Sequence, residues 1–123
     1  MIVQIKDVPN IMVAFKADGE VTKEDFELVK EEVAQLVEAT GKLNYLLFLD
    51  NSPKDFTLGA WLQDALLGIS NITKWNRAAI ISDSDAVIKF TDAFSKVMPG
   101  EFKGYPKADY DKAVNWVSER SDI

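Results

Sequence analysis

Five aspartates in the middle of the chain are the side chains best suited to acid–base or metal chemistry. They are Asp50, Asp55, Asp64, Asp83 and Asp85. Asp50 and Asp83 each follow an apolar run typical of a strand, and ligands of open α/β sheets sit beyond the carboxyl ends of strands. Two such carboxylates could form an acid–base pair or bind Mg²⁺. Aspartates in such positions are more commonly caps, so we expect no enzyme, no metal site and no cofactor.

Two missing residue types narrow the chemistry further. The chain has no cysteine, which excludes a disulfide framework, a thiolate zinc site and a cysteine nucleophile. It has no histidine either, so the commonest general base and metal ligand near neutral pH is missing. A hydrolytic triad of the usual kind cannot be built from these residues.

Composition indicates one acidic globular domain. The 123 residues, 47% of them apolar, suit a single domain over 1–123. The net charge is −6, and residues 1–70 hold twelve acidic side chains against six basic ones. Because an acidic surface repels phosphates, we expect no nucleic-acid partner. No apolar run approaches the roughly 20 residues that span a bilayer, and no signal-peptide pattern is present, so we expect a cytoplasmic protein.

Apolar periodicity and turn residues predict the order of strands and helices. Strands are predicted at residues 2–5, 11–17, 44–50, 78–81 and 101–105. Pro9 and Asn10 lie between the first two strands and predict an antiparallel hairpin. Helices alternate with the later strands, which favours parallel pairing. The predicted fold is α/β, a mixed, mostly parallel open sheet of about five strands with four helices, in the order β-β-α-β-α-β-α-β-α.

Capping residues predict where the helices begin and end. Thr22 with Asp25 resembles a capping box, and Gly41 is typical of a left-handed helix end. Residues 82–85 are predicted to begin the third helix as caps, and Pro106 to open the last. The glutamates of the first helix are expected to form a solvated outer face; a carboxylate metal site is the alternative.

The segment 56–75 is the most distinctive part of the chain. It holds two of the three tryptophans and is predicted to be a helix with one broad apolar stripe. Gly59 and Gly68 each weaken that helix by up to about 1 kcal/mol relative to alanine, which would let it pack closely or move. The segment is either an ordinary core helix or a moving cover over an apolar site.

The order of elements resembles the SpoIIAA-like group of the STAS superfamily over residues 13–117. Supporting features are the Trp-x-Arg-Ala-Ala-Ile run at residues 75–80 and the closing segment at residues 102–116. The resemblance implies a CRAL-TRIO-like mixed sheet with helices packed on it. It also implies a non-enzymatic module, which in some branches is a phosphorylation-controlled partner switch and in others a suspected binder of lipid-like molecules.

The switch branch of that family carries Asp-Ser-Ser-Gly at the start of the second helix. The matching region here reads Asp55-Phe56-Thr57-Leu58-Gly59 and lacks the tandem serine. Thr57 is the one hydroxyl near that position and is expected to be a plain helix cap. Asp50 and Thr57 nevertheless bound the loop at which a regulatory interaction would act.

Two functions remain open from the sequence. The first is a binding module for a lipid-like or amphiphilic ligand, or for peripheral contact with a membrane, through the second and third helices. Its apolar candidate residues are Phe56, Leu58, Trp61, Leu62, Ala65, Leu66, Trp75, Phe90 and Phe94. The alternative is a protein-interaction or regulatory domain acting through residues 50–57. The apolar edge of a mobile helix also favours a homodimer.

Overall fold

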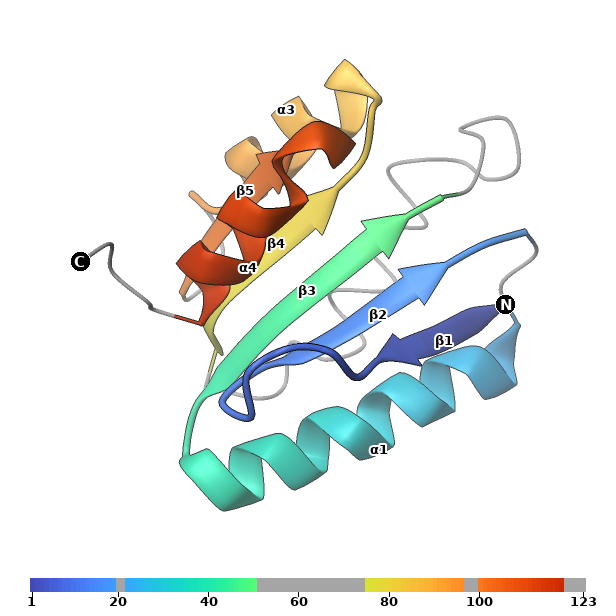
Figure 1. Ribbon diagram of the computed structural model, residues 1–123, viewed down its shortest axis with the longest axis vertical. Coiled ribbons are helices and arrows are strands. Elements are labelled where there is room, and N and C mark those ends of the chain that lie inside the picture. The colour runs from blue at the N-terminus through green and yellow to red at the C-terminus, as the bar shows by residue number, and fades with distance from the viewer. Residues whose placement is uncertain (20–21, 51–74, 97–99, 119–123) are drawn as a thin grey trace.

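The computed structural model describes residues 1–19, 22–50, 75–96 and 100–118 of the chain. Five strands and three α-helices lie in these residues, together with one short 3₁₀ helix, η2 (Figure 1). The strands are β1 (Ile2–Ile5), β2 (Val13–Ala17), β3 (Leu43–Leu49), β4 (Trp75–Ile81) and β5 (Glu101–Tyr105). The helices are α1 (Lys23–Thr40), α3 (Asp85–Phe94), η2 (Lys107–Asp109) and α4 (Tyr110–Val117).

The strands form one mixed sheet in the order β1-β2-β3-β4-β5. β1 pairs with β2 in antiparallel orientation, whereas β2–β3, β3–β4 and β4–β5 are parallel pairs. This confirms the α/β fold with a mixed five-stranded sheet and the initial hairpin. Because β2 to β5 run the same way, their carboxyl ends lie along one border of the sheet. We call this border the carboxyl edge.

Helices cover both faces of the sheet, which explains why β3 is apolar without alternation. Tyr45 and Leu47 belong to the core that contains residues of α1 and α3. Leu46 belongs to the opposite core, which contains Ala113 and Val117 of α4. A strand buried on both faces favours apolar side chains at successive positions, as from Tyr45 to Leu49 in β3.

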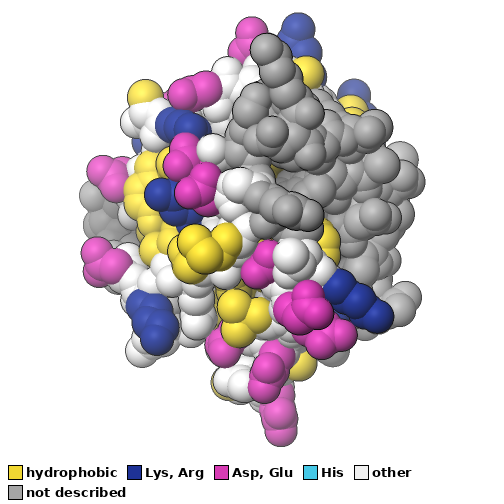
Figure 2. Space-filling model, turned by 90° about the vertical axis from the view of Figure 1, so that its right-hand side faces the viewer, with side chains coloured by type: hydrophobic (Ala, Val, Ile, Leu, Met, Phe, Trp, Pro, Cys, Tyr) yellow, Lys and Arg dark blue, Asp and Glu magenta, His cyan; other side chains and the backbone are white. Residues whose placement is uncertain are grey.

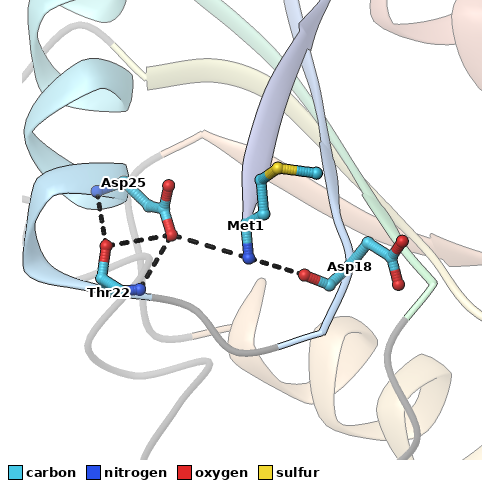
Figure 3. A network of polar contacts seen from close by, with 4 residues as sticks. All are labelled: Met1, Asp18, Thr22 and Asp25. Atoms are coloured by element: carbon cyan, nitrogen blue, oxygen red, sulfur yellow. Dashed lines mark hydrogen bonds and ion pairs between the residues drawn. The ribbon is translucent and has the colours of Figure 1, made fainter.

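The predicted cap of the first helix is confirmed. Thr22 Oγ1 accepts a hydrogen bond from the Asp25 N–H, and the Asp25 carboxylate accepts one from the Thr22 N–H (Figure 3). The same carboxylate lies 3.6 Å from the Met1 ammonium, which donates to the carbonyl of Asp18. The backbone hydrogen bond from Thr22 is the largest factor that lowers the pKa of Asp25. Gly41 ends the helix with φ of 79°, as predicted.

The segment predicted as the second helix falls mainly on residues 51–74, which lie outside the described residues. The described part of the chain therefore holds three α-helices where the sequence predicted four. The last residue of the predicted second helix, Trp75, was assigned wrongly. It is the first residue of β4 and pairs with Leu43. The aromatic side chain suits a strand, and pairing with β3 makes β4 begin three residues before the predicted start.

Close contact between α3 and β5 depends on one glycine. A Cβ at Gly104 would lie 2.7 Å from Ile88 Cα and 2.9 Å from its carbonyl oxygen. Only a residue without a side chain allows the helix backbone to approach the strand so closely. Within the described residues, no helix is both long and apolar enough to cross a lipid bilayer.

Candidate interaction site at the carboxyl edge of the sheet

A cluster of charged side chains lies where three parallel strands end. Asp50 directly follows β3, and its backbone N–H donates to the carbonyl of Ala17 at the end of β2. Its carboxylate lies 2.7 Å from Lys107 Nζ and 3.6 Å from Lys16 Nζ. Lys107 follows β5 and Lys16 lies near the end of β2, so one aspartate connects the carboxyl ends of β2, β3 and β5.

The two lysines share an aromatic ring as well as the carboxylate. Lys107 Nζ lies 5.6 Å and Lys16 Nζ 6.0 Å from the centre of the Phe48 ring. Tyr110 packs edge-on against the same ring, with 6.0 Å between the ring centres. Attraction between each ammonium and the ring face restricts where the lysines extend. We call Lys16, Phe48, Asp50 and Lys107 the edge cluster.

The ionisation of the cluster follows from these contacts. The hydrogen bond and charge of Lys107 are the largest factors that lower the pKa of Asp50, and Lys16 lowers it further. Burial raises the pKa of Tyr110, and the charges of Asp7 and Asp111 add to that effect. Asp50 is therefore an ionised acceptor near neutral pH, a state unsuited to donating a proton as a general acid.

Asp83 lies at the same edge but is not paired with Asp50. Its carboxylate accepts a hydrogen bond of 3.1 Å from the backbone N–H of Lys107, whose ammonium binds Asp50. Instead of pairing with each other, Asp50 and Asp83 both contact Lys107, the first through its ammonium and the second through its backbone N–H. Ser84 caps α3 by accepting from the Val87 N–H, as the sequence predicted for this segment.

The structure describes the side chains of two apolar candidate residues, Trp75 and Phe90. Trp75 is buried among Tyr45 and Phe102, with ring centres 5.8 and 5.0 Å away. Phe90 is half-buried and packs against the core that contains Val87. Phe94 ends α3, and nothing is described of its side chain. The remaining candidates and the regulatory Thr57 lie outside the described residues, namely Phe56, Leu58, Trp61, Leu62, Ala65 and Leu66.

Sequence reasoning selected Asp50 but missed Lys16 and Lys107. Both are single lysines at the carboxyl ends of predicted strands, the same positional signal that selected Asp50. They were missed because acidic residues alone were considered for chemistry at that edge. Which lysines would contact Asp50 depends on strand order, which places β2 directly beside β3.

Comparison with known proteins supports the fold. The model of the SpoIIAA-like family matches residues 12–118. A similar solved structure is that of an uncharacterized protein from the DUF3478 family with a SpoIIAA-like fold, from Shewanella loihica PV-4. The two chains are 26% identical with a TM-score of 0.64, covering 94% of this chain and 93% of that chain. A search of curated proteins found no match.

Proposed function

Because the chain belongs to the SpoIIAA-like family, we propose that it is a non-enzymatic, STAS-type interaction domain whose protein partner docks at the carboxyl edge. The observation that carries the proposal is the contact of one carboxylate, Asp50, with the two lysines of the edge cluster. In this arrangement Asp50 holds two lysine ammonium groups at the surface, where a partner can reach them.

The exposure of the edge cluster suits a docking surface. The side chains of Lys16, Asp50 and Lys107 are 42%, 36% and 33% exposed. They are thus accessible to a partner while their mutual contacts and the Phe48 ring limit their freedom. Ordering long side chains costs about 0.5–1.5 kcal/mol each on association, and prior ordering reduces that cost.

The charge of the edge cluster indicates what the partner would present. Within the edge cluster, two ammonium groups and one carboxylate leave one positive charge, and the Asp83 carboxylate lies beside the backbone of Lys107. We expect the partner to place a carboxylate between the lysines, since charge complementarity steers association and fixes register.

Charge reversal at the edge tests the proposal. Tagged native chain, Asp50→Lys and Lys107→Glu would be used to capture proteins from the source cells, with quantification by mass spectrometry. Glu31→Lys on the exposed side of α1 is the matched control for a change of charge. A partner retained by the native chain and the control, and lost from both edge variants, is expected. Equal capture by all four chains would refute docking at this edge.

A second function, binding of an amphiphilic ligand, is favoured by one polar atom. The indole N–H of Trp75 is buried and has no hydrogen-bond partner within the described residues. Buried tryptophan N–H groups usually have a partner, since leaving one unsatisfied costs about 1–3 kcal/mol. An ester or carboxylate oxygen of a ligand could accept this hydrogen bond, while the acyl chain contacts the aromatic core.

Tryptophan fluorescence tests the second function. A Trp61→Phe, Trp116→Phe double variant keeps Trp75 as the one tryptophan. Titration with liposomes of phosphatidylcholine or phosphatidylglycerol, or with a fatty acid, should shift its emission, and native mass spectrometry should show the added ligand mass. An unchanged spectrum with every lipid class, together with an unliganded mass, would eliminate this function.

A further inference from the structure

Strand β1 lies at one edge of the sheet, and its pairing with β2 determines which backbone groups point outward. Met1 donates to the carbonyl of Asp18, and the Asp18 N–H donates to the carbonyl of Met1. Hydrogen-bonded and non-hydrogen-bonded pairs alternate along an antiparallel ladder. Given the register of β1 and β2, the backbone N–H and C=O of Ile2 and Gln4 therefore point away from β2.

This outer edge is closed at Ile2 but not at Gln4. The Ile2 backbone faces the carboxylate of Asp25, in the first turn of α1, and helps to lower the pKa of that carboxyl. No described residue forms a hydrogen bond with the backbone N–H or C=O of Gln4 on this side. An edge strand with free backbone groups is a template for another strand.

The opposite edge of the sheet is closed more completely. On β5, the Phe102 N–H donates to Ser95 Oγ at 2.9 Å, and the Gly104 N–H donates to Asp92 Oδ1 at 2.9 Å. Both acceptors come from α3 or from its end. Side chains thus accept from two outward-pointing N–H groups of β5, whereas on β1 a carboxylate faces Ile2 and no described side chain accepts from the Gln4 N–H.

A cavity lies beside the open part of β1. It has a volume of about 380 Å³ and lies between the β1–β2 hairpin and α1. Gln4 and Val13 line it from the strands, and Glu32 and Leu36 from the helix. This volume is at the lower end of the range for ligand pockets, and is enough for one or two side chains.

Charge defines which side chain would suit this cavity. Helix α1 carries six acidic and two basic residues. Acidic side chains gather at the lower end of the face in Figure 2, at the level of α1 in Figure 1. Glu32 is half-buried at the cavity and is contacted by the Gln4 side-chain amide at 3.4 Å. Lys6 lines the cavity from the strand side, so a cationic side chain of a ligand would lie on the helix side, at Glu32.

We propose that this β1–α1 groove binds an extended basic peptide segment of a protein partner as an added strand. The backbone of the segment pairs with the outward N–H and C=O of Gln4. One apolar side chain enters the cavity over Val13 and Leu36, and a Lys or Arg two positions away reaches Glu32. Residues i and i+2 of a strand share one face, so a basic-apolar alternating sequence satisfies both contacts.

The proposed groove is independent of the edge cluster. Gln4 pairs with Phe15 and lies toward the hairpin turn, whereas the edge cluster forms at the carboxyl ends of β2, β3 and β5. Loss of binding at one site therefore leaves the other testable.

Substitution of Gln4 separates backbone pairing from side-chain contact. The probe is a fluorescein-labelled, amidated hexapeptide of alternating Val and Arg, titrated by fluorescence anisotropy. Gln4→Pro removes the outward N–H while leaving the β1–β2 ladder intact, because proline is tolerated where an edge N–H faces out. We expect it to weaken binding at least about tenfold, whereas Gln4→Ala, which keeps the N–H, binds within about threefold of the native chain.

Charge reversal on α1 tests the basic side chain of the peptide. Glu32→Lys is expected to weaken binding about fivefold. Glu31→Lys, an exposed residue that does not line the cavity, is the matched control and should change binding less than about twofold. Equal effects of the two substitutions would show attraction to an acidic surface instead of the groove and would overturn the proposal.

Further outcomes keep the proposal falsifiable. If circular dichroism shows that Gln4→Pro does not fold, the peptide is titrated into the native chain and its amide NMR shifts are followed instead. Peptide-induced shifts outside β1 and α1 would overturn the proposal. No binding to the native chain would also overturn it. If sedimentation shows a native dimer that Gln4→Pro disrupts, the occupant of the edge is a second copy of the chain, and the peptide proposal is wrong.

Discussion

Lys107 Nζ lies 2.7 Å from Asp50 Oδ1, although the two residues are 57 positions apart in the chain. The contact joins the end of β3 to the segment after β5, across the intervening strand β4. Lys107 is also the first residue of η2, the short helix that precedes α4. A change of charge at either residue therefore alters the geometry of the whole carboxyl edge.

The contribution of Asp50 to stability should depend on pH. Its lysine contacts lower its pKa below the ordinary value of 3.8. A carboxyl whose pKa is lower in the folded state stabilises the fold above its unfolded pKa, and the contribution is lost as pH falls through the folded pKa. Asp50→Asn should thus differ from the native chain near neutral pH and converge with it in strong acid. Urea denaturation at several pH values measures this difference; a gap unchanged down to about pH 2.5 would contradict the lysine contacts.

Gly104→Ala should destabilise the fold more than Gly41→Ala. A methyl group at Gly104 meets the backbone of Ile88, which cannot move without shifting α3 from β5. The expected loss is about 2–3 kcal/mol in the free energy of unfolding. Gly41 has open space around it but φ of 79°, so alanine there should cost about 1 kcal/mol. Chemical denaturation of both variants tests the order, and equal losses would contradict the close packing of α3.

Thr22→Ala should weaken the start of α1. It removes the side-chain acceptor for the Asp25 N–H and half of the capping box. We expect a loss of about 1 kcal/mol in the free energy of unfolding. Lys30→Ala, at an exposed position inside the same helix, should change it by less than about 0.5 kcal/mol. The cap would be energetically unimportant if thermal denaturation gave both variants the same stability.

Arg77→Lys should loosen the attachment of α4, even though the charge is kept. The Arg77 guanidinium donates to the carbonyl of Trp116 at 2.7 Å and lies 5.2 Å from the centre of its ring. A lysine cannot combine the planar stacking with that hydrogen bond, so a loss of about 1 kcal/mol is expected. Glu101→Ala removes only the exposed ion pair of Arg77 and should cost less. Hydrogen exchange should show faster exchange in α4 for Arg77→Lys; unchanged protection there would argue against this role.

Local patterns predicted most of the fold because they are short-range. The capping box at Thr22, the left-handed Gly41 and the turn at Pro9 each follow from a few neighbouring residues. The start of β4 was missed because Trp75 was grouped with the apolar segment before it, whereas pairing with Leu43 places it in the strand. Tertiary pairing thus overrode the local pattern at that position.

The candidate site was predicted only in part for the same reason. Asp50 could be selected because it directly follows a buried strand. Its contact with Lys107 depends on the order of strands, and the free backbone of Gln4 depends on the register of β1 with β2. Neither relationship is encoded in residue spacing along the chain.

Site-specific photo-crosslinking from the carboxyl edge tests the proposed function most directly. A benzophenone amino acid would replace Ala108, an exposed residue next to Lys107, and, in a control chain, Ala34 on the exposed side of α1. Crosslinked products formed in the source cells would be identified by mass spectrometry. We predict a protein joined to position 108 and not to position 34, and lost when Asp50→Lys is added. The same products from both positions, or products unaffected by Asp50→Lys, would contradict docking at the edge cluster.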